Sequence, residues 1–304
     1  MRRSVLLLLI ACSKHLERGA FDQITELDSP PGVSDLSIDD RGTLWAIPER
    51  DRFVLELHGA TVTPHPLEGV ADNIDTEAIA WLAPGRFALG TEGQDEPTAS
   101  VMFGELRGDG HVVIQTTRPL TDDELGVKLI ANQGAEGICG RGDDVLVAIE
   151  TVGKLADGTR WAPIVHLHGT QIVSVAKLRL TSSTGKISAL WCDGPGLTDV
   201  WAIERHYAIN RLLHFHAGTG ELTPKMVLDL DALTHGTLNL EGLVRLPDGR
   251  FALINDNQGA TVDGPTELLV LPRGSVKPRT CADCSSRSSS SRSSRERKSS
   301  RSIR

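Results

Sequence analysis

The chain has 304 residues, of which 24% are charged and 39% hydrophobic, with 30 glycines and 15 prolines. This composition is typical of a turn-rich globular protein and excludes a chain that is disordered or fibrous throughout. The formal net charge of −8 is unevenly distributed along the chain. Residues 285–304 carry +6 and Arg2 and Arg3 add +2, which leaves −16 for residues 12–284. A body this acidic attracts cations and repels nucleic acid. We therefore expect no nucleic-acid partner for the folded part.

The N-terminus has the pattern of a very short signal peptide, with two arginines, an apolar run and a small residue before Cys12. The run is too short to cross a bilayer, which takes about 20 apolar residues. Leu9-Ile10-Ala11-Cys12 resembles the lipobox of bacterial lipoproteins. This resemblance implies cleavage before Cys12, lipidation of Cys12 and a place in the bacterial cell envelope, facing the periplasm or the surface. Ser13 after the cysteine favours the outer membrane. A plain secretory signal or a start codon placed too late is the alternative.

Four more cysteines follow, at positions 139, 192, 281 and 284. An oxidising compartment permits disulfides, but the spacing leaves their pairing open. Cys281 and Cys284 form a lone C-x-x-C beside a Ser/Arg-rich stretch, and we assign both to a tail. That tail, residues 277–304, is of low complexity and is predicted to be disordered and solvated, with binding to nucleic acid or anionic lipid as the alternative.

Five segments share one pattern: a small or acidic residue, an apolar run, a glycine turn, a second apolar run and an acidic residue. They are residues 34–49, 77–92, 136–150, 188–204 and 241–256. Their first and last residues are 15, 15, 14, 16 and 15 positions apart. Short apolar runs joined by Asp-Gly or Pro-Gly turns are hairpin signals. Each segment is therefore predicted to be a β-hairpin.

The segments start 43 to 59 residues apart, which is the size of one four-stranded propeller blade with its loops. After Glu241 only three strand-like runs remain, whereas residues 21–27 form an unpaired strand ahead of the first repeat. Pairing this strand with the last blade would close the ring and remove its edges. The sequence thus predicts an all-β, five-bladed β-propeller closed by an N-terminal strand. Six blades are possible if the long third repeat hides another, and a β-sandwich is the alternative fold.

The predicted parts are a signal peptide (1–11), an anchor and linker (12–20), the propeller (21–276) and the tail (277–304).

The hairpin geometry predicts an acidic ring. The first and last residues of a hairpin face each other across its open end, with Cβ atoms about 5 Å apart. This pairs Glu77 with Glu92, Glu136 with Glu150, and Glu241 with Asp256, while Glu49 and Glu204 occupy only the last position. Because equivalent strand ends converge on one face of a propeller, all eight carboxylates should surround one mouth of the channel. Like charges this close are unfavourable unless they are protonated, paired or bridged by a cation.

Carboxylates joined by the side-chain carbonyls of Asn132, Asn255 and Asn257 would make an oxygen-only site, which suits calcium. The predicted metal ligands are Glu77, Glu92, Glu136, Glu150, Glu204, Glu241, Asp256 and Asn257. Arg50 and Arg205 each follow an acidic ring residue and offer internal salt bridges instead. A third interpretation is that these acids cap the hairpins by accepting backbone N–H groups.

Three stretches resemble the "esterase-like activity of phytase" domain family. They are Ile203-Glu204-Arg205, Asn239-Leu240-Glu241-Gly242-Leu243 and Asn255-Asp256-Asn257, which match its LER, N-[IL]-E-G-[IL] and D-N motifs. The resemblance implies a secreted or envelope-bound propeller and phosphate-ester hydrolysis. Few basic residues accompany the acids, which departs from a true propeller phytase. The repeats also resemble SdiA-regulated-like envelope propellers, a resemblance that implies a metal-loaded channel without assigned catalysis.

No nucleophile elbow, H-E-x-x-H, P-loop or dinucleotide fingerprint occurs in the sequence. Two functions follow. The first is a monomeric envelope lipoprotein whose acidic channel mouth binds a cation, expected to be calcium, and which serves as a binding module for an unidentified envelope protein. The alternative is a calcium-dependent phosphoesterase or esterase-like hydrolase that activates water on the metal and takes a small anionic ester. In that case Arg205 would bind the substrate anion and His206 would shuttle protons.

Overall fold

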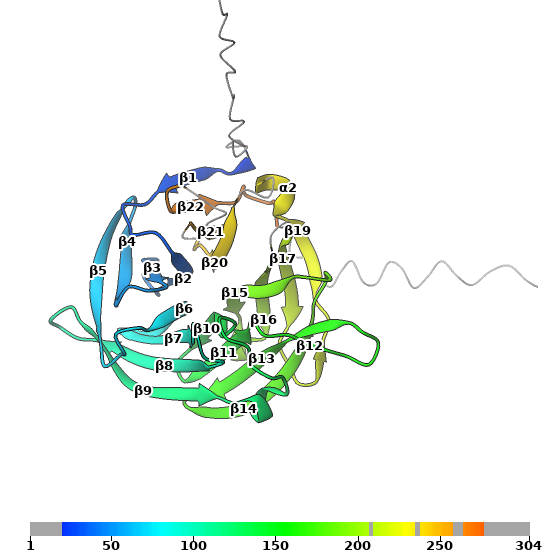
Figure 1. The fold of residues 1–304 in the computed structure, drawn as a ribbon. Coiled ribbons are helices and arrows are strands. Elements are labelled where there is room, and N and C mark those ends of the chain that lie inside the picture. The colour runs from blue at the N-terminus through cyan, green and yellow to red at the C-terminus, as the bar shows by residue number, and fades with distance from the viewer. Residues whose placement is uncertain (1–19, 207–208, 235–237, 258–263, 277–304) are drawn as a thin grey trace, which may run out of the picture.

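The computed structural model describes residues 20–206, 209–234, 238–257 and 264–276. Within these ranges the chain is almost entirely β-structure, and its strands are arranged in a ring around a central axis (Figure 1). The predicted signal peptide, Cys12, Cys281, Cys284 and the predicted tail lie outside the described residues.

The described strands form four sheets, of 4, 6, 4 and 8 strands, and the largest consists of two antiparallel four-stranded runs joined by a short parallel pairing. Five antiparallel four-stranded runs can be followed in these sheets; we call them blades 1 to 5 and give their strands from the axis outward. Blade 1 is β2 (Val33–Ile38), β3 (Leu44–Pro48), β4 (Phe53–His58) and β5 (Thr61–Glu68), and blade 2 is β6 (Asp75–Ala83), β7 (Arg86–Glu92), β8 (Ala99–Leu106) and β9 (Val112–Leu120). Blade 3 is β10 (Ala135–Arg141), β11 (Asp144–Ile149), β13 (Arg160–His168) and β14 (Gln171–Arg179), and blade 4 is β15 (Lys186–Asp193), β16 (Asp199–His206), β17 (Ile209–His216) and β19 (Lys225–Asp229). Blade 5 is β20 (Asn239–Arg245), β21 (Phe251–Asp256), β22 (Glu267–Val270) and β1 (Gln23–Glu26).

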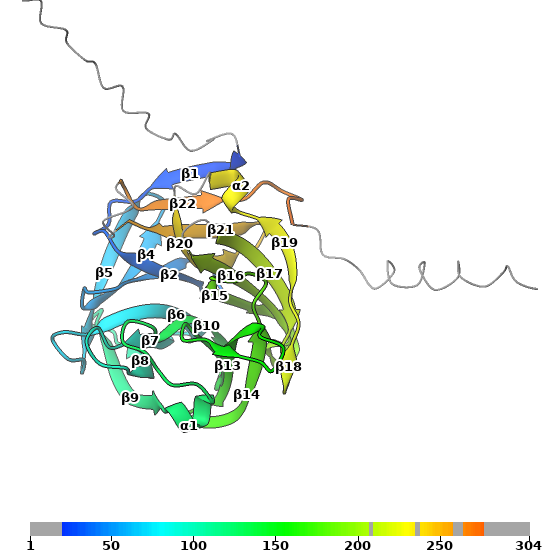
Figure 2. The ribbon, with the colours of Figure 1, turned by 45° about the vertical axis from the view of Figure 1, so that its right-hand side comes forward.

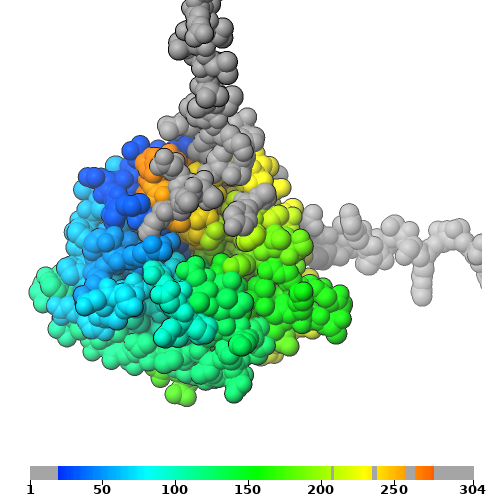
Figure 3. Space-filling model, in the orientation of Figure 1, coloured from blue at the N-terminus to red at the C-terminus, as the bar shows by residue number. Residues whose placement is uncertain are grey.

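Short elements complete the ring. The strand β12 (Gly153–Lys154) pairs with β13, and β18 (Glu221–Leu222) pairs in parallel with β14. The helices α1 (Asp122–Leu125) and α2 (Asp231–Thr234) and a 3₁₀ turn at Pro195–Leu197 lie in connections between strands. The β-propeller prediction is confirmed. On the face seen in the space-filling view, the surfaces of blades 1, 2 and 3 adjoin one another, from blue through cyan to green (Figure 3).

The N-terminal strand closes the ring as predicted. β1 pairs antiparallel with β22 from Gln23↔Val270 to Glu26↔Glu267, so blade 5 combines both ends of the folded chain (Figure 2). A strand from one terminus completes the blade built by the other, and the last blade is not left with an unpaired edge. This places the inner strand β20 beside β2 and brings all five inner strands around one axis.

The inner strands approach one another closely. A Cβ atom on Gly137 would lie 2.8 Å from the backbone of Ala189 on β15, and one on Gly242 would lie 2.7 Å from the backbone of Leu36 on β2. Both distances are shorter than a side chain tolerates, so these two positions need glycine. The E-G dipeptides at 136–137 and 241–242 therefore combine an acid for the channel with a glycine for blade-to-blade packing.

Side chains also join neighbouring inner strands. The buried carboxylate of Asp35 on β2 accepts the backbone N–H of Leu36 at 2.8 Å and that of Ile79 on β6 at 3.0 Å. A disulfide links Cys139 on β10 to Cys192 on β15, with 5.7 Å between the Cα atoms. Since these strands belong to blades 3 and 4, the disulfide joins two blades, a pairing that spacing alone left open.

Candidate cation-binding site

Each inner strand carries a β-bulge near its start. The pairing register shifts at Val33/Asp35, Thr76/Ala78, Ala135/Gly137, Ile187/Ala189 and Leu240/Gly242, which skips Ser34, Glu77, Glu136, Ser188 and Glu241. These are the first residues of the five repeats. A bulge leaves one residue unpaired and redirects its side chain.

The bulges overturn the predicted cross-strand pairs. Glu92 faces Asp75 rather than Glu77, and Asp256 faces Asn239 rather than Glu241. Glu150 follows the end of β11, whose last residue pairs with Ala135. The prediction was wrong because it assumed a constant register from the turn to the open end of the hairpin. The predicted acidic ring holds for seven of its eight carboxylates, which line the channel mouth, and fails for Glu204.

A cavity of about 240 Å³ lies at this mouth, and we call it the acidic mouth. Its carboxyl groups belong to Glu49, Asp75, Glu77, Glu92, Glu136, Glu150, Glu241 and Asp256, and Arg50, Asn132, Arg205 and Asn239 complete the lining. These residues come from all five blades and from the loop before β10. The structure thus brings together most of the predicted ring.

One half of the acidic mouth is neutralised by neighbouring side chains. Arg205 Nη2 lies 2.5 Å from Glu241 Oε1, and Lys186 Nζ lies 3.0 Å from Glu150 Oε2. The Asn239 amide donates to Glu241 Oε1 and to Asp256 Oδ2, each at 2.9 Å. Acids in this half therefore have the internal partners that the sequence offered as an alternative to a metal.

The other half has little compensation. Glu49, Asp75 and Glu77 each place one carboxylate oxygen within 4.8 Å of the other two. Among the described residues, the only basic side chain that forms an ion pair with any of the three is that of Arg50. Its Nε lies 3.8 Å from Glu49 Oε2, and the side chain is 58% exposed. Asp75 Oδ1 is buried without a hydrogen-bond partner. A buried carboxylate oxygen without a donor is costly, so this half is suited to a cation.

Burial and mutual repulsion shift the ionisation of the cluster. Burial, together with the charges of Asp256 and Asp75, raises the pKa of Glu49 to about 8. Burial raises the pKa of Glu241 to about 8 in spite of Arg205, and that of Glu92 to about 7. The pKa values of Glu77 and Glu136 also lie well above the usual range, first because of burial and then because of neighbouring glutamates. Without a cation, part of the cluster holds protons at neutral pH.

This ionisation predicts that the cation-free protein loses stability as the pH rises. A carboxyl group with a raised pKa binds its proton more tightly in the folded state, so its contribution is complete below the unfolded pKa, about 4.5, and is lost as the pH rises through the folded pKa. With folded values of about 7 and about 8, Tm in chelator should fall between about pH 5 and about pH 9. Thermal melts across this range test it; a Tm that rises throughout the range would contradict it.

Four predicted residues do not line the acidic mouth: Glu204, His206, Asn255 and Asn257. The side-chain carbonyl of Asn255 accepts the backbone N–H of Glu267 instead. The Glu204 carboxylate is buried and accepts the backbone N–H groups of Thr181 at 3.0 Å and Ser182 at 2.9 Å as well as both hydroxyls. Asn257 Oδ1 accepts the Gly32 N–H at 3.1 Å and holds the start of β2. Glu204 and Asn257 therefore cap backbone N–H groups, as the third interpretation expected. Their predicted role as metal ligands is wrong, because backbone N–H groups already occupy their oxygen atoms.

His206 also lies outside the cavity lining, and burial with the nearby Lys186 and Arg205 lowers its pKa.

Sequence reasoning missed Asp75 and Asn239 as lining residues. Both stand two positions before a bulged glutamate, in the patterns Asp75-x-Glu77 and Asn239-x-Glu241. The bulge falls at the glutamate, and in both patterns the two side chains line the same mouth; this spacing was the available signal.

Comparisons with known proteins agree with the fold. The family model described as SdiA-regulated matches residues 20–150. The allergen Mala s 1 of Malassezia sympodialis is similar in structure, with a TM-score of 0.53 at 9% identity over 83% of this chain and 96% of that chain. The PQQ-bound aldose sugar dehydrogenase of Streptomyces coelicolor gives a TM-score of 0.45 at 10% identity over 82% and 97%. The similarity to Mala s 1 supports the fold alone. No curated protein sequence matches the chain.

No helix in the described part of the chain has the length and apolar character needed to cross a bilayer.

Proposed function

We propose that this protein is a cell-envelope binding module whose acidic mouth holds a hard divalent cation, calcium, on Glu49, Asp75 and Glu77. The observation that carries the proposal is the uncompensated half of the mouth, where three carboxylates from blades 1 and 2 converge and one buried oxygen of Asp75 has no partner. The match of the SdiA-regulated family over residues 20–150 covers the segments that supply all three residues.

The donor set fits calcium. Ca²⁺ binds six to eight oxygen atoms at about 2.3–2.6 Å, so two of its ligands are at most about 5 Å apart. The three carboxylates meet this condition, since their oxygen atoms lie within 4.8 Å of one another. Glu92 and Asn132 line the same cavity, and we assign them as further oxygen donors. No cysteine or histidine lines the cavity, which makes zinc a poor match.

The geometry favours binding over hydrolysis. Arg205, the residue expected to bind a substrate anion, is already engaged by Glu241 and by the Asn239 side chain. His206 does not line the cavity that would hold the metal. Placement in the envelope rests on the lipobox-like N-terminus, and the Cys139–Cys192 disulfide supports an oxidising compartment.

Calcium should raise the thermal stability of the folded body. A ligand that binds only the folded state at about 100 times its Kd contributes about 2.7 kcal/mol, which corresponds to about 5–10 °C in Tm for a domain of this size. Asp75→Asn should abolish most of this shift because it removes a carboxylate from the site. In chelator the same variant should be at least as stable as the wild type, because it removes one repelling charge.

The matched control is Glu105→Gln on β8, an exposed acid outside the acidic mouth, which should keep the full calcium shift. A variant that is unstable in both buffers has a folding defect, which the chelator melt reveals; Glu77→Gln is then the second test. An equal shift for the wild type and both site variants would contradict the assignment of these ligands.

A further inference from the structure

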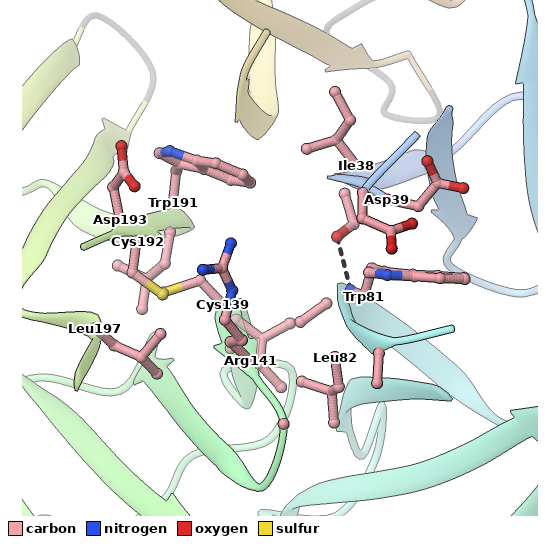
Figure 4. A pocket seen from close by; sticks show the side chains of 18 of the residues that line it. Ile38, Asp39, Trp81, Leu82, Cys139, Arg141, Trp191, Cys192, Asp193 and Leu197 are labelled. Carbon is pink, nitrogen blue, oxygen red and sulfur yellow. Dashed lines mark hydrogen bonds between the residues drawn. A yellow bond between two sulfur atoms is a disulfide. The ribbon is translucent and has the colours of Figure 1, made fainter. Parts of the chain in front are cut away.

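A second cavity, of about 470 Å³, lies at the opposite end of the inner strands. It is lined by the ends of β2, β6, β10 and β15 and by the turns that follow them (Figure 4). It shares no residue with the acidic mouth. We call it the turn-side cavity. Its volume falls within the range of small-molecule sites, about 300–1,000 Å³.

The floor of the turn-side cavity is apolar, with Ile38, Leu82, Ile138 and Leu197 among its lining residues. Two tryptophans add flat walls. Trp81 is backed by Trp45, with the ring centroids 5.7 Å apart and the planes inclined by 19°. The ring of Trp191 reaches over the cavity from blade 4 (Figure 4). Such walls suit a ligand with an apolar or aromatic body.

Two of the acids in the lining are already engaged. Asp39 accepts the backbone N–H groups of Arg41 at 2.9 Å and Thr43 at 2.8 Å and pairs with the Arg41 guanidinium at 3.2 Å. Asp193 pairs with Arg245 at 3.1 Å. Each of these acids is paired with an arginine, so neither presents an unbalanced charge to a ligand.

Asp40 and Arg141 differ from these acids. Both are exposed, and neither has an ion pair or side-chain hydrogen bond among the described residues. Going round the axis, the lining presents Asp40 from blade 1, Trp81 from blade 2, Arg141 from blade 3 and Trp191 from blade 4. A free carboxylate and a free guanidinium thus come from blades that are not neighbours, with an indole after each of them. Figure 4 shows the Arg141 guanidinium extending into the middle of the cavity.

The walls that carry two of these groups are fixed relative to each other. Arg141 follows Cys139 by two residues and Trp191 directly precedes Cys192, and the disulfide joins these two strands. A site whose groups are held before binding loses less conformational entropy when a ligand arrives.

We propose that the turn-side cavity binds a small zwitterion with an apolar body, of the class of free α-amino acids with an apolar or aromatic side chain. The carboxylate of the ligand pairs with Arg141, its ammonium group pairs with Asp40, and its side chain lies on the apolar floor beside the tryptophans. A simple anion would meet the Asp40 charge and a simple cation the Arg141 charge, whereas a zwitterion satisfies both.

Three probes that differ by one charged group test this assignment: L-phenylalanine, 3-phenylpropionate, which lacks the ammonium group, and phenethylamine, which lacks the carboxylate. Calorimetric titration of the full chain should show L-phenylalanine binding about tenfold tighter than either analogue. Arg141→Ala should remove the preference over phenethylamine, and Asp40→Asn should remove the preference over 3-phenylpropionate. Each variant should leave the other preference in place.

Arg107→Ala is the control. Arg107 is an exposed arginine in the turn between β8 and β9, outside this cavity, so its replacement should change none of the affinities. Thermal melts show whether each variant is folded, and Arg141→Gln and Asp40→Ser replace any variant that is not. The proposal is overturned if L-phenylalanine does not bind at millimolar concentration. It is equally overturned if 3-phenylpropionate binds as tightly, which would indicate a simple anion site.

Discussion

Arg205→Met is expected to destabilise the protein by about 3–5 kcal/mol at about pH 9, because it leaves a buried carboxylate without its cation. The Arg205 side chain is 20% exposed and that of Glu241 7%, and their closest atoms are 2.5 Å apart. Arg205 also donates to Asn239, which in turn donates to Glu241 and Asp256. Removing the guanidinium therefore disturbs the paired half of the acidic mouth as a unit.

The loss should be smaller at about pH 6. The pKa of Glu241 is already raised to about 8, so without Arg205 the carboxyl group takes up a proton at the lower pH and its charge disappears. The double variant Arg205→Met/Glu241→Gln should recover much of the stability at about pH 9, since it removes the unpaired charge. Denaturant unfolding at both pH values measures these differences. Equal losses for the single and double variants would show that Arg205 acts through packing rather than through its pairing with Glu241.

Loss of the Cys139–Cys192 disulfide should cost about 4 kcal/mol, the loop-closure term for two cysteines that are 53 residues apart. The bond closes a loop that contains most of blade 3, so its removal increases the freedom of the unfolded chain. Cys139→Ser/Cys192→Ser and the reduced wild type should unfold at the same denaturant concentration, below that of the oxidised protein. A double variant as stable as the oxidised protein would contradict this account.

The fold could be predicted because its signals are local and repeated. Turn glycines, apolar runs and a constant hairpin length identified the blades, and the unpaired strand at residues 21–27 indicated how the ring closes. The bulges could not be predicted in this way, because counting from a turn assumes that every residue of one strand has a partner on the other. One extra residue per inner strand changed which side chains face each other.

The candidate site could be predicted only in part, because equivalent positions in a repeat meet different neighbours. Glu204 occupies the same repeat position as Glu49, yet Thr181 and Ser182 reach it from the preceding loop. Asp75 was missed because its role depends on the bulge at Glu77. The division of the acidic mouth into a paired and an uncompensated half depends on contacts between blades, which the hairpin pattern does not contain.

The most direct test of the cation site is calorimetric titration of the full chain with calcium at about pH 6 and about pH 8.5, in two buffers with different ionisation enthalpies. Calcium and protons compete for the same carboxylates, so the affinity should be higher at the higher pH, and binding near pH 7 should release protons to the buffer. Binding heats that show tighter binding at high pH together with proton release would support calcium in the acidic mouth. No binding at either pH, or binding without proton release and with equal affinity at both, would contradict it.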